Sequence, residues 1–267
     1  MGERDHLTTM PWNPDRYHQF QKERSAPFED ALALVTVRAG LRVVDLGCGT
    51  GELTRRLADA LPDCDALGLD SSAEMLAKAA PHARPGLRFE QGSIEDFASG
   101  EGEADYDLIF SHAALQWVDD HQRLIPRLFQ RVRSGGQFVA QMPHNFSHTA
   151  HRLIRDTAAE APFAAHLGGW SPIPIRAVLE IDRYAELFFA AGAAAITVFE
   201  KVYPHLLADA DAVADWTSGT ALVPYAERLG DAYPAFMERY RAKLREALPE
   251  SPLFYGFRRI LWGVTRQ

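Results

Sequence analysis

Short apolar runs alternate with amphipathic stretches between residues 42 and 142. The runs RVVDL, DALGLD, LRFEQG, YDLIFS and GQFVAQM are typical of buried strands, which we expect at 42–46, 65–70, 87–92, 106–111 and 136–142. Apolar residues at helical spacing predict helices at 51–61, 72–80 and 119–132, and Ser134-Gly135-Gly136 is expected to end the last one. Because strands alternate with helices, the connections are crossovers, and the sheet is predicted to be parallel with helices on both faces.

The pattern changes after residue 142. Residues 162–180 are rich in proline and glycine, which suits a covering segment rather than a core element. Beyond it we expect a helix at 182–192, a strand at 194–203, helix throughout 209–248 and a closing strand at 254–265. A further helix, at 14–37, is predicted before the first strand.

These elements are predicted to form a single domain over 1–267. Its core, 42–142, is the part expected to bind a cofactor, and 12–37 is expected to form an N-terminal helical cover. Insertions at 150–182 and 204–250 are expected to form a lid that recognises the substrate. We place this lid over the carboxyl edge of the sheet, where ligands bind in open α/β sheets.

Composition and charge narrow the class of protein. The 267 residues carry a formal net charge of -8 and no dense run of lysine or arginine, so the electrostatic footprint of a nucleic-acid-binding protein is missing. Two cysteines, with no metal-ligand spacing around them, favour a reducing compartment. The N-terminal segment is charged, and the longest apolar run is broken by Glu186 and Gly192. We therefore expect a soluble cytoplasmic protein with no signal peptide or membrane span, and a monomer rather than an oligomer.

The stretch VVDLGCGTGEL, residues 43–53, carries the most informative motif. Its three glycines allow a tight strand-to-helix turn whose backbone N–H groups approach a ligand closely. A dinucleotide-binding loop has its third glycine one position later, where this sequence has Glu52. Asp45, just before the turn, would repel a pyrophosphate and attract a cationic group. A nucleoside that carries an ammonium and no phosphate fits better, which favours S-adenosylmethionine over NAD.

Further residues fit the same cofactor. Asp70 ends the second strand, where an acid accepts hydrogen bonds from both ribose hydroxyls. After the third strand, Ile94 is expected to lie against an adenine ring, with Ser93 or Glu95 near its exocyclic amine. The segment SHAALQW, after the fourth strand, is expected to flank the methionine end. Strand, glycine turn, helix, strand and acid in this order make a more specific signal than the glycines alone.

Together these motifs resemble the class I S-adenosylmethionine-dependent methyltransferases, and more narrowly the trans-aconitate 2-methyltransferase family. The matching pieces span nearly the whole chain: WNPDRYHQFQKERSAP (12–27), VDLGCGTGELT (44–54), GLDSSAEMLAKA (68–79), FSHAALQWVDDH (110–121), QMPHNFSH (141–148) and DWTSGTALVPY (215–225). The resemblance implies a Rossmann-like, doubly wound α/β fold of seven strands with the last strand antiparallel, plus helical lid insertions. It also implies that Tyr17 and Arg24 join the cofactor site, with Arg24 near the cofactor carboxylate.

Two sets of site residues follow. The predicted cofactor site comprises Tyr17, Arg24, Asp45, Gly47, Cys48, Gly49, Gly51, Asp70, Ser71, Met75, Gly92, Ser93, Ile94, Ser111, His112, Ala113 and Trp117. The predicted substrate site comprises His144, Trp170, Arg183, Tyr184, Trp216, Tyr225 and Arg258. Neighbouring Arg258 and Arg259 point to opposite faces of the last strand, so at most one of them faces the pocket.

The expected reaction needs no general base, because a carboxylate acceptor is already ionised at neutral pH. We therefore assign no catalytic acid–base residue, and expect a small acid such as trans-aconitate to become a methyl ester. One position departs from the family pattern: TALVPY places Val223 where T-G-L-R-P supplies an arginine. A less charged acid, or a hydroxyl, amine or carbon acceptor, therefore stays open as an alternative.

A metal site, a reactive thiol and two other classes of protein are alternatives to this interpretation. Asp119, Asp120 and His121 resemble metal ligands, but a helix start capped by an aspartate explains them, and we predict no metal. Cys48 lies in the glycine turn, where a small filler is the simpler role than a reactive thiol. A non-catalytic S-adenosylmethionine-binding protein and a nicotinamide oxidoreductase complete the alternatives, and Asp45 and Glu52 oppose the latter.

Overall fold

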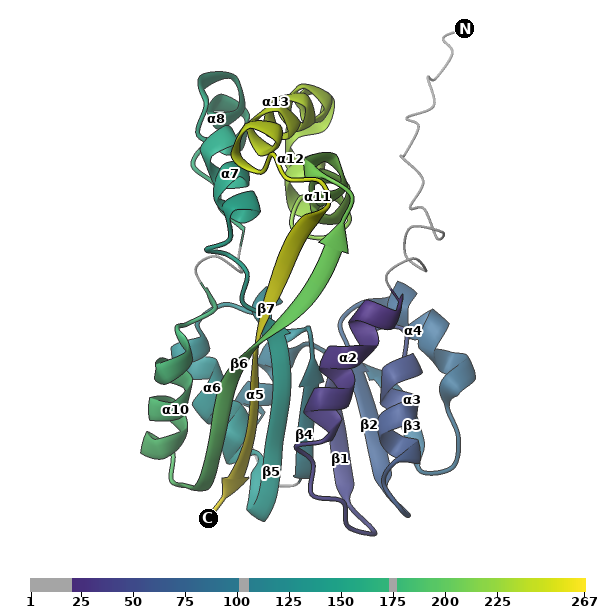
Figure 1. Cartoon of the computed structure of the whole chain (residues 1–267). Helices are drawn as coiled ribbons and strands as arrows, with labels where there is room; N and C mark the ends of the chain where they lie inside the picture. Colours follow the sequence, from purple (N-terminus) through teal and green to yellow (C-terminus); the bar gives the residue numbers. More distant parts are fainter. Residues whose placement is uncertain (1–20, 101–105, 173–176) are drawn as a thin grey trace, which may run out of the picture.

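The computed structural model describes residues 21–100, 106–172 and 177–267. Its centre is one seven-stranded sheet in the order β3-β2-β1-β4-β5-β7-β6. The strands are β1 Arg42–Leu46, β2 Asp65–Asp70, β3 Leu87–Gln91, β4 Tyr106–His112, β5 Val132–Pro143, β6 Ala193–Leu207 and β7 Leu253–Arg266. Strands β1 to β5 pair in parallel, whereas β7 is antiparallel to both β5 and β6 (Figure 1). The predicted Rossmann-like sheet with an antiparallel last strand is confirmed.

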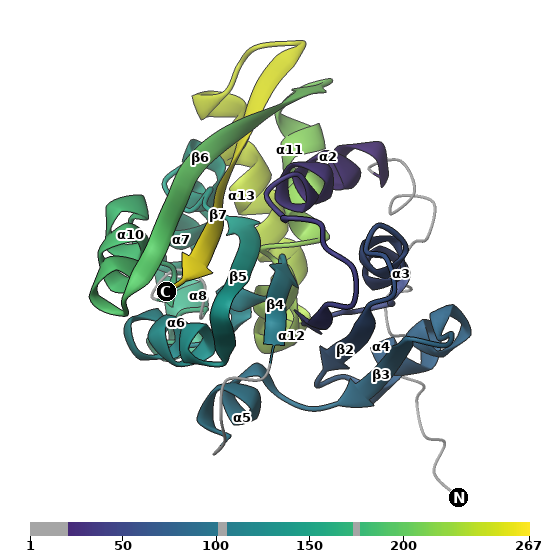
Figure 2. The ribbon, with the colours of Figure 1, turned by 90° about the horizontal axis from the view of Figure 1, so that it is seen from below.

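Helices cover both faces of this sheet (Figure 2). On one face, α2 (Gln21–Leu32) and α3 (Glu52–Asp59) pack through Phe28 and Leu57 on β1, β2 and β4. On the other face lie α5 (Ile94–Ser99), α6 (His121–Gln130) and α10 (Ile181–Ala190), whose apolar stripes bury Phe138 and Trp262. Helix α4 (Ala73–Ala79) packs beside β2 and β3. Each helix therefore buries one apolar stripe, which is the arrangement that crossover connections require.

A second hydrophobic cluster lies beyond the carboxyl edge of the sheet. Strands β6 and β7 run past the other strands and reach this group of helices (Figure 1). Its members are α7 (Thr149–Ala158), α8 (Ala161–Leu167), α11 (Ala210–Ser218), α12 (Val223–Leu229) and α13 (Tyr233–Ala247). Phe236 and Tyr240 of α13 are fully buried among them. The two predicted insertions thus share one apolar core above the edge where ligands bind in such sheets.

Several boundaries differ from the predictions for identifiable reasons. The segment 209–248 is not one helical run: Gly219 follows α11, and prolines at the first turns of α12 and α13 begin new helices. Strand β5 begins at Val132, before the Ser134-Gly135-Gly136 segment, because Tyr106 of β4 pairs with Val132 across a register shift. Of the predicted helix 14–37, residues 21–32 form α2, and 14–20 lie outside the described residues.

Within the ranges that the structure describes, no helix is long and apolar enough to cross a membrane.

Candidate functional site

The glycine turn joins β1 to α3 at the carboxyl edge of the sheet. The backbone N–H groups of Gly47 and Cys48 both donate to Leu69 O, at 2.8 and 3.0 Å, which ties the turn to the end of β2. Gly47 has φ +75°, and a Cβ built on it would lie 2.1 Å from Ala114 Cβ. A side chain is therefore excluded at Gly47, both by its left-handed backbone and by the loop after β4.

Gly49 has a different environment. Its φ is +55°, but a Cβ built on it would meet nothing within 4 Å, so this part of the turn faces open space. The N–H of Gly49 donates to Asp70 Oδ2 at 2.8 Å, and Ser72 N donates to Asp70 Oδ1 at 2.9 Å. Asp70 is thereby held at the end of β2 beside the open turn, and each carboxylate oxygen can still accept a further hydrogen bond. This arrangement suits a ligand with two neighbouring hydroxyls.

Asp45 lies beneath the turn, near the end of β1. Its carboxyl group is buried, with a residue exposure of 4%, and accepts a hydrogen bond from Thr54 Oγ1 at 2.6 Å on Oδ2. Among the described residues, Oδ1 has no hydrogen-bond partner. Burial raises the pKa of Asp45 to about 7, against the opposing effect of Thr54. A buried carboxylate with one unsatisfied oxygen is costly alone and is stabilised by a cation beside it.

Residues after β2 and β3 complete this part of the edge. Ser72 Oγ accepts from Met75 N and caps α4, whereas the predicted contacts Ser71 and Met75 are exposed. Ser93 caps α5 by accepting from Asp96 N at 2.9 Å, and Ile94 is buried against the core. A Cβ on Gly92 would lie 2.8 Å from Leu69 Cδ1, and one on Gly51 would lie 2.8 Å from Ala79 Cβ. These two glycines therefore serve close packing behind the turn.

Residues at the end of β4 differ in what they offer a ligand. Ser111 is fully buried and its hydroxyl donates to Leu46 O at 2.9 Å, so the side chain joins β4 to β1, and its contact with the cofactor stays a prediction. His112 follows at the strand end, and Ala113 has the left-handed φ of +55°. Trp117 is 48% exposed in the short 3-10 turn that comes next. Of these, His112 is the buried titratable group.

His112 belongs to a cluster of three polar side chains on the α2 face of the sheet, together with Gln141 and Arg259. Arg259 Nη1 of β7 donates to Gln141 Oε1 of β5 at 2.9 Å, and Gln141 is the register partner of His112. Neither Gln141 Nε2 nor His112 Nε2 has a hydrogen-bond partner among the described residues, although both atoms are buried. Burial, reinforced by the charge of Arg259, lowers the pKa of His112 to about 3. His112 is therefore neutral at physiological pH.

Two predicted substrate residues, Tyr184 and Arg183, lie on α10, away from the glycine turn. Tyr184 of α10 is fully buried, stacks on Trp262 at 5.1 Å between ring centroids, and its hydroxyl lies 2.6 Å from His121 Nδ1. The same hydroxyl accepts from Leu179 N at 3.0 Å, so its hydrogen bonding is complete within the core. Arg183 is exposed on the same helix and pairs with Glu186. Tyr184 thus has its contacts in the core and Arg183 on the surface of α10, on the face of the sheet away from α2, and their place in the substrate site stays a prediction.

Arg258 and His144 converge on one carboxylate. Arg258 Nε and Nη2 donate to Glu200 Oε1 and Oε2, at 2.5 and 2.8 Å, and His144 Nδ1 lies 2.7 Å from Glu200 Oε2. Arg258 Nη1 also donates to Ser147 Oγ at 3.0 Å. The contacts among Glu200, Arg258 and His144 join β6, β7 and the loop after β5. Because Glu200 neutralises Arg258, this cluster offers an acid little net positive charge.

The aromatic candidates lie among the helices beyond the edge. Tyr225 of α12 is buried, and its ring packs edge-on against Trp170 at 5.3 Å between centroids. Trp216 of α11 is partly buried, with its ring 4.8 Å from His205 of β6. Val223, at the start of α12, is 42% exposed. All three aromatic candidates thus lie in or against the second core, and Trp216 also contacts His205 and Phe257.

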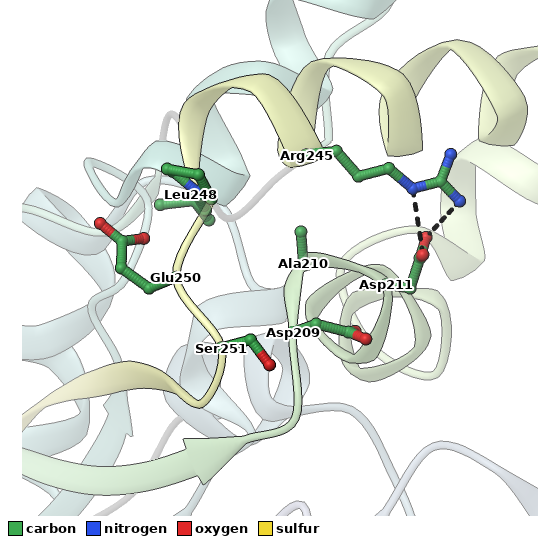
Figure 3. A pocket seen from close by; sticks show the side chains of 8 residues that line it. Asp209, Ala210, Asp211, Arg245, Leu248, Glu250 and Ser251 are labelled. Atoms are coloured by element: carbon green, nitrogen blue, oxygen red, sulfur yellow. Dashed lines mark hydrogen bonds and ion pairs between the residues drawn. The ribbon is translucent and has the colours of Figure 1, made fainter.

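A small hollow of about 200 Å³ lies apart from this edge, between the start of α11 and the segment after α13 (Figure 3). Three of the residues that line it are acidic, namely Asp209, Asp211 and Glu250, and its arginine, Arg245, is paired with Asp211 at 2.8 Å. An acid would be repelled there. We therefore do not place the substrate in this hollow.

Other predictions have simpler outcomes. Tyr17 lies outside the described residues, and Arg24 belongs to α2. Burial, together with Asp45 and Asp70, raises the pKa of the Cys48 thiol, which agrees with a packing role rather than a reactive thiol. Asp120 occupies the N-cap of α6 but makes no side-chain capping bond. In the part of the chain that the structure describes, no group of three potential metal ligands occurs.

Sequence reasoning did not identify three groups that the structure places beside residues of the candidate site. Thr54, the partner of Asp45, stands nine residues away on α3, and only the folded turn brings the two together. Gln141 carried a visible signal, since it is a polar residue within the apolar run QFVAQM. Glu200 neutralises Arg258 from 58 residues away, which no local pattern reveals.

Comparison with known proteins agrees with this geometry. A family model described as a methyltransferase domain matches residues 43–136. The trans-aconitate 2-methyltransferase of Deinococcus radiodurans is 47% identical over 262 residues, which cover 96% of this chain and 99% of that protein. Two solved structures share the fold. The YcgJ protein from Bacillus subtilis matches with a TM-score of 0.61 and 15% identity, over 91% of this chain and 99% of that one. Phosphoethanolamine N-methyltransferase 2 from Haemonchus contortus, in complex with S-adenosyl-L-methionine, matches with a TM-score of 0.54 and 16% identity, over 92% of this chain and 53% of that one.

The residues at the edge fit S-adenosylmethionine, the cofactor of this enzyme class. The unsatisfied Asp45 Oδ1 matches an ammonium, and the open side of the turn at Gly49 leaves room for a ligand beside Asp70. The protein is an S-adenosylmethionine-dependent methyltransferase, and its chain belongs to the trans-aconitate 2-methyltransferase family.

Proposed function

We propose that the protein transfers a methyl group to a carboxylate oxygen of trans-aconitate or a closely related small acid. The observation that carries this proposal is the extent of the likeness to the Deinococcus radiodurans enzyme, 47% identity over 96% of this chain. The methyltransferase-domain model ends at residue 136. The likeness therefore includes β6, β7 and the helices beyond the edge, which are the parts that would contact an acceptor.

The chain's own residues have a positioning task in this reaction. S-adenosylmethionine, when bound, supplies an electrophilic methyl group on a positively charged sulfur. Asp45 would hold its ammonium and Asp70 its ribose hydroxyls. A carboxylate acceptor is already ionised at neutral pH, so the chain needs no general base. Neutral His112 is consistent with this, because a histidine with a pKa of about 3 is a poor base. Alignment of the reactants and exclusion of water then provide the catalysis.

Val223 supports a second class of acceptor, acids with fewer carboxylates. This exposed valine stands at the position where the family pattern supplies an arginine. An acid with fewer carboxylates needs fewer cations, so a mono- or dicarboxylic acid is the runner-up acceptor. A panel that runs from tricarboxylic to monocarboxylic acids separates the two, since each carboxylate removed weakens one charge-assisted hydrogen bond.

We also propose the setting in which the enzyme works. The acceptor is a small-molecule acid rather than a nucleic acid, because the formal net charge is -8. The helices of the second core, α7, α8 and α11 to α13, act as the lid over the edge within a single domain. The enzyme is a monomer of the cytoplasm, where Cys48 and Cys64 stay reduced; both are free thiols in the structure.

The test is product analysis. The protein is incubated with S-adenosylmethionine carrying a deuterated methyl group and with each acid of the panel, and the products are identified by mass spectrometry. We expect one labelled methyl in a base-labile ester of trans-aconitate, with an equal amount of S-adenosylhomocysteine. Label found only in a hydroxyl, amine or carbon product, or in no acid at all, would contradict the proposal.

A further inference from the structure

Three polar side chains, His112, Gln141 and Arg259, form a row on the α2 face across strands β4, β5 and β7. Gly47 packs against Ala114, two residues beyond His112. His112 pairs in register with Gln141, and Gln141 accepts a hydrogen bond from Arg259. Starting from the turn, the row therefore crosses β4 and β5 and reaches β7. It connects the place where the cofactor would bind to a guanidinium on the adjoining strand.

We propose that Arg259, together with Gln141 and His112, binds a carboxylate of the acid acceptor. This inference deepens the proposed function and rests on it. It assigns the acceptor site to the α2 face of β5 and β7. It also identifies the cation that serves the acceptor in a chain that has Val223 where the family pattern has an arginine.

The geometry makes these three side chains a donor set. The hydrogen bond from Arg259 occupies Gln141 Oε1, which leaves the amide Nε2 as a donor, and this nitrogen is buried without a partner among the described residues. His112 Nε2 is in the same situation one strand away. A buried polar atom without a partner is costly, and a ligand placed here would accept from Gln141 Nε2 and, in the tautomer that carries the ring proton on Nε2, from His112. A carboxylate has the two oxygens this requires.

Arg259 itself is held for this role. Its guanidinium carbon lies 4.9 Å from the centre of the Phe257 ring, so the side chain rests on an aromatic face of its own strand. Its positive charge reaches the neighbouring groups: burial lowers the pKa of His112 and of His205, and Arg259 lowers both further. Asp30 of α2, an acid on the same face, is engaged by Lys201 Nζ and Tyr203 Oη, each at 2.6 Å.

The adjacent arginine provides the contrast. Arg258 points to the opposite face of β7, where Glu200 receives two of its N–H groups. A carboxylate ligand would have to compete with Glu200 for that guanidinium and would be repelled by it. On the α2 face, Arg259 donates to the amide oxygen of Gln141. The alternation of strand side chains lets at most one of the two arginines face the pocket, and competition from Glu200 makes Arg258 the less suitable one.

The experiment measures acid binding separately from turnover. Calorimetry follows trans-aconitate titrated into the protein saturated with S-adenosylhomocysteine, for the wild type and for Arg259→Met, Arg259→Lys and Gln141→Leu. Arg266→Met is the matched control, since Arg266 lies on the same strand and donates to Gln130 O and Val132 O near the opposite edge of the sheet. The S-adenosylhomocysteine Kd, measured for each variant, reports whether the fold and the cofactor site are intact.

We expect Arg259→Met to raise the trans-aconitate Kd by roughly 10- to 100-fold, which is what loss of a charged hydrogen-bonding group costs. Arg259→Lys should recover part of the loss, and Gln141→Leu should raise the Kd by roughly 3- to 10-fold. Arg266→Met should stay within twofold, and all variants should keep the S-adenosylhomocysteine Kd within about threefold.

Three outcomes would overturn the inference. The first is an unchanged acid Kd in Arg259→Met, and the second is an equal loss of acid and S-adenosylhomocysteine binding in both Arg259 variants. The third is a wild type that binds neither trans-aconitate nor any other acid of the product-analysis panel in the same titration. Wild-type protein that binds trans-aconitate but never methylates it would contradict the proposed function, and the Arg259 comparison would still be decided by the binding data.

Discussion

Substitution of Asp45 by asparagine separates what the carboxylate does for the ligand from what it does to the fold. Asp45 is buried beneath the glycine turn, with Thr54 on one oxygen and no described partner on the other. Burial raises the pKa of Asp45 from 3.8 to about 7. The folded protein therefore holds this proton between those two pH values while the unfolded chain releases it. It follows that Asp45 stabilises the cofactor-free fold at low pH, and that this stability is lost as the pH rises through about 7.

The size of the effect follows from the pKa difference. One pK unit corresponds to about 1.36 kcal/mol, and about two units of the window lie between pH 5 and the folded pKa. Cofactor-free wild type should therefore lose about 3 kcal/mol of unfolding free energy from Asp45 between pH 5 and pH 8. Asparagine does not titrate, so Asp45→Asn should not show this loss. The histidines are the same in both proteins, so their contribution cancels in the difference.

Urea denaturation of both proteins at several pH values measures this directly. The difference in unfolding free energy, Asp45→Asn minus wild type, should rise by about 3 kcal/mol from pH 5 to pH 8. Thr54→Val should move the wild-type decline to higher pH, because Thr54 opposes the rise in the pKa of Asp45. A difference that stays constant across this range, within about 0.5 kcal/mol, would refute the claim that Asp45 is a strained buried carboxylate.

Three further predictions concern the same edge. Gly47→Ala should destabilise the fold by roughly 2–4 kcal/mol, because the new Cβ would clash with Ala114. Gly49→Ala, whose Cβ would point into open space, should cost about 1 kcal/mol and mainly weaken S-adenosylhomocysteine binding. Equal denaturation midpoints for the two variants would contradict this difference. Tyr184→Phe should lower the unfolding free energy by about 1–3 kcal/mol and leave the KM for the acid unchanged, since its hydroxyl serves His121 and Leu179 in the core; a raised KM would return Tyr184 to the substrate site. The S-adenosylhomocysteine Kd, measured by calorimetry, should fall about tenfold per pH unit up to about pH 7 and then level off, because ionised Asp45 pairs with the ammonium, and Asp45→Asn should lack this slope.

Local sequence patterns were sufficient for the frame of the sheet. Strands β1 and β2 occupy the predicted residues, 42–46 and 65–70, because their continuous apolar runs are bounded by turn residues. The glycine turn and Asp70 were likewise identified from spacing, since the first crossover of this fold fixes where both must lie. These features depend on contacts between residues close in sequence, which is the range over which patterns are informative.

The acceptor side depended on contacts between distant residues. Strand alternation places Arg258 and Arg259 on opposite faces, but only the pairing of β6 with β7 shows that Glu200 lies beside Arg258. Tyr184 and Phe188 are four residues apart on one helical face, a visible sign of burial, yet the partner His121 stands 63 residues earlier. Sequence reasoning therefore located the glycine turn, whereas the contacts made by the predicted acceptor residues become visible only in the folded chain.

The most direct test of the whole account is a crystal structure of the protein with S-adenosylhomocysteine and trans-aconitate. The account predicts ribose hydroxyls on Asp70, an ammonium within reach of Asp45, and one acid carboxylate about 3 Å from both Arg259 and Gln141 Nε2. An acid bound instead on the Arg258 and Glu200 face, or in the hollow beside Arg245, would contradict it.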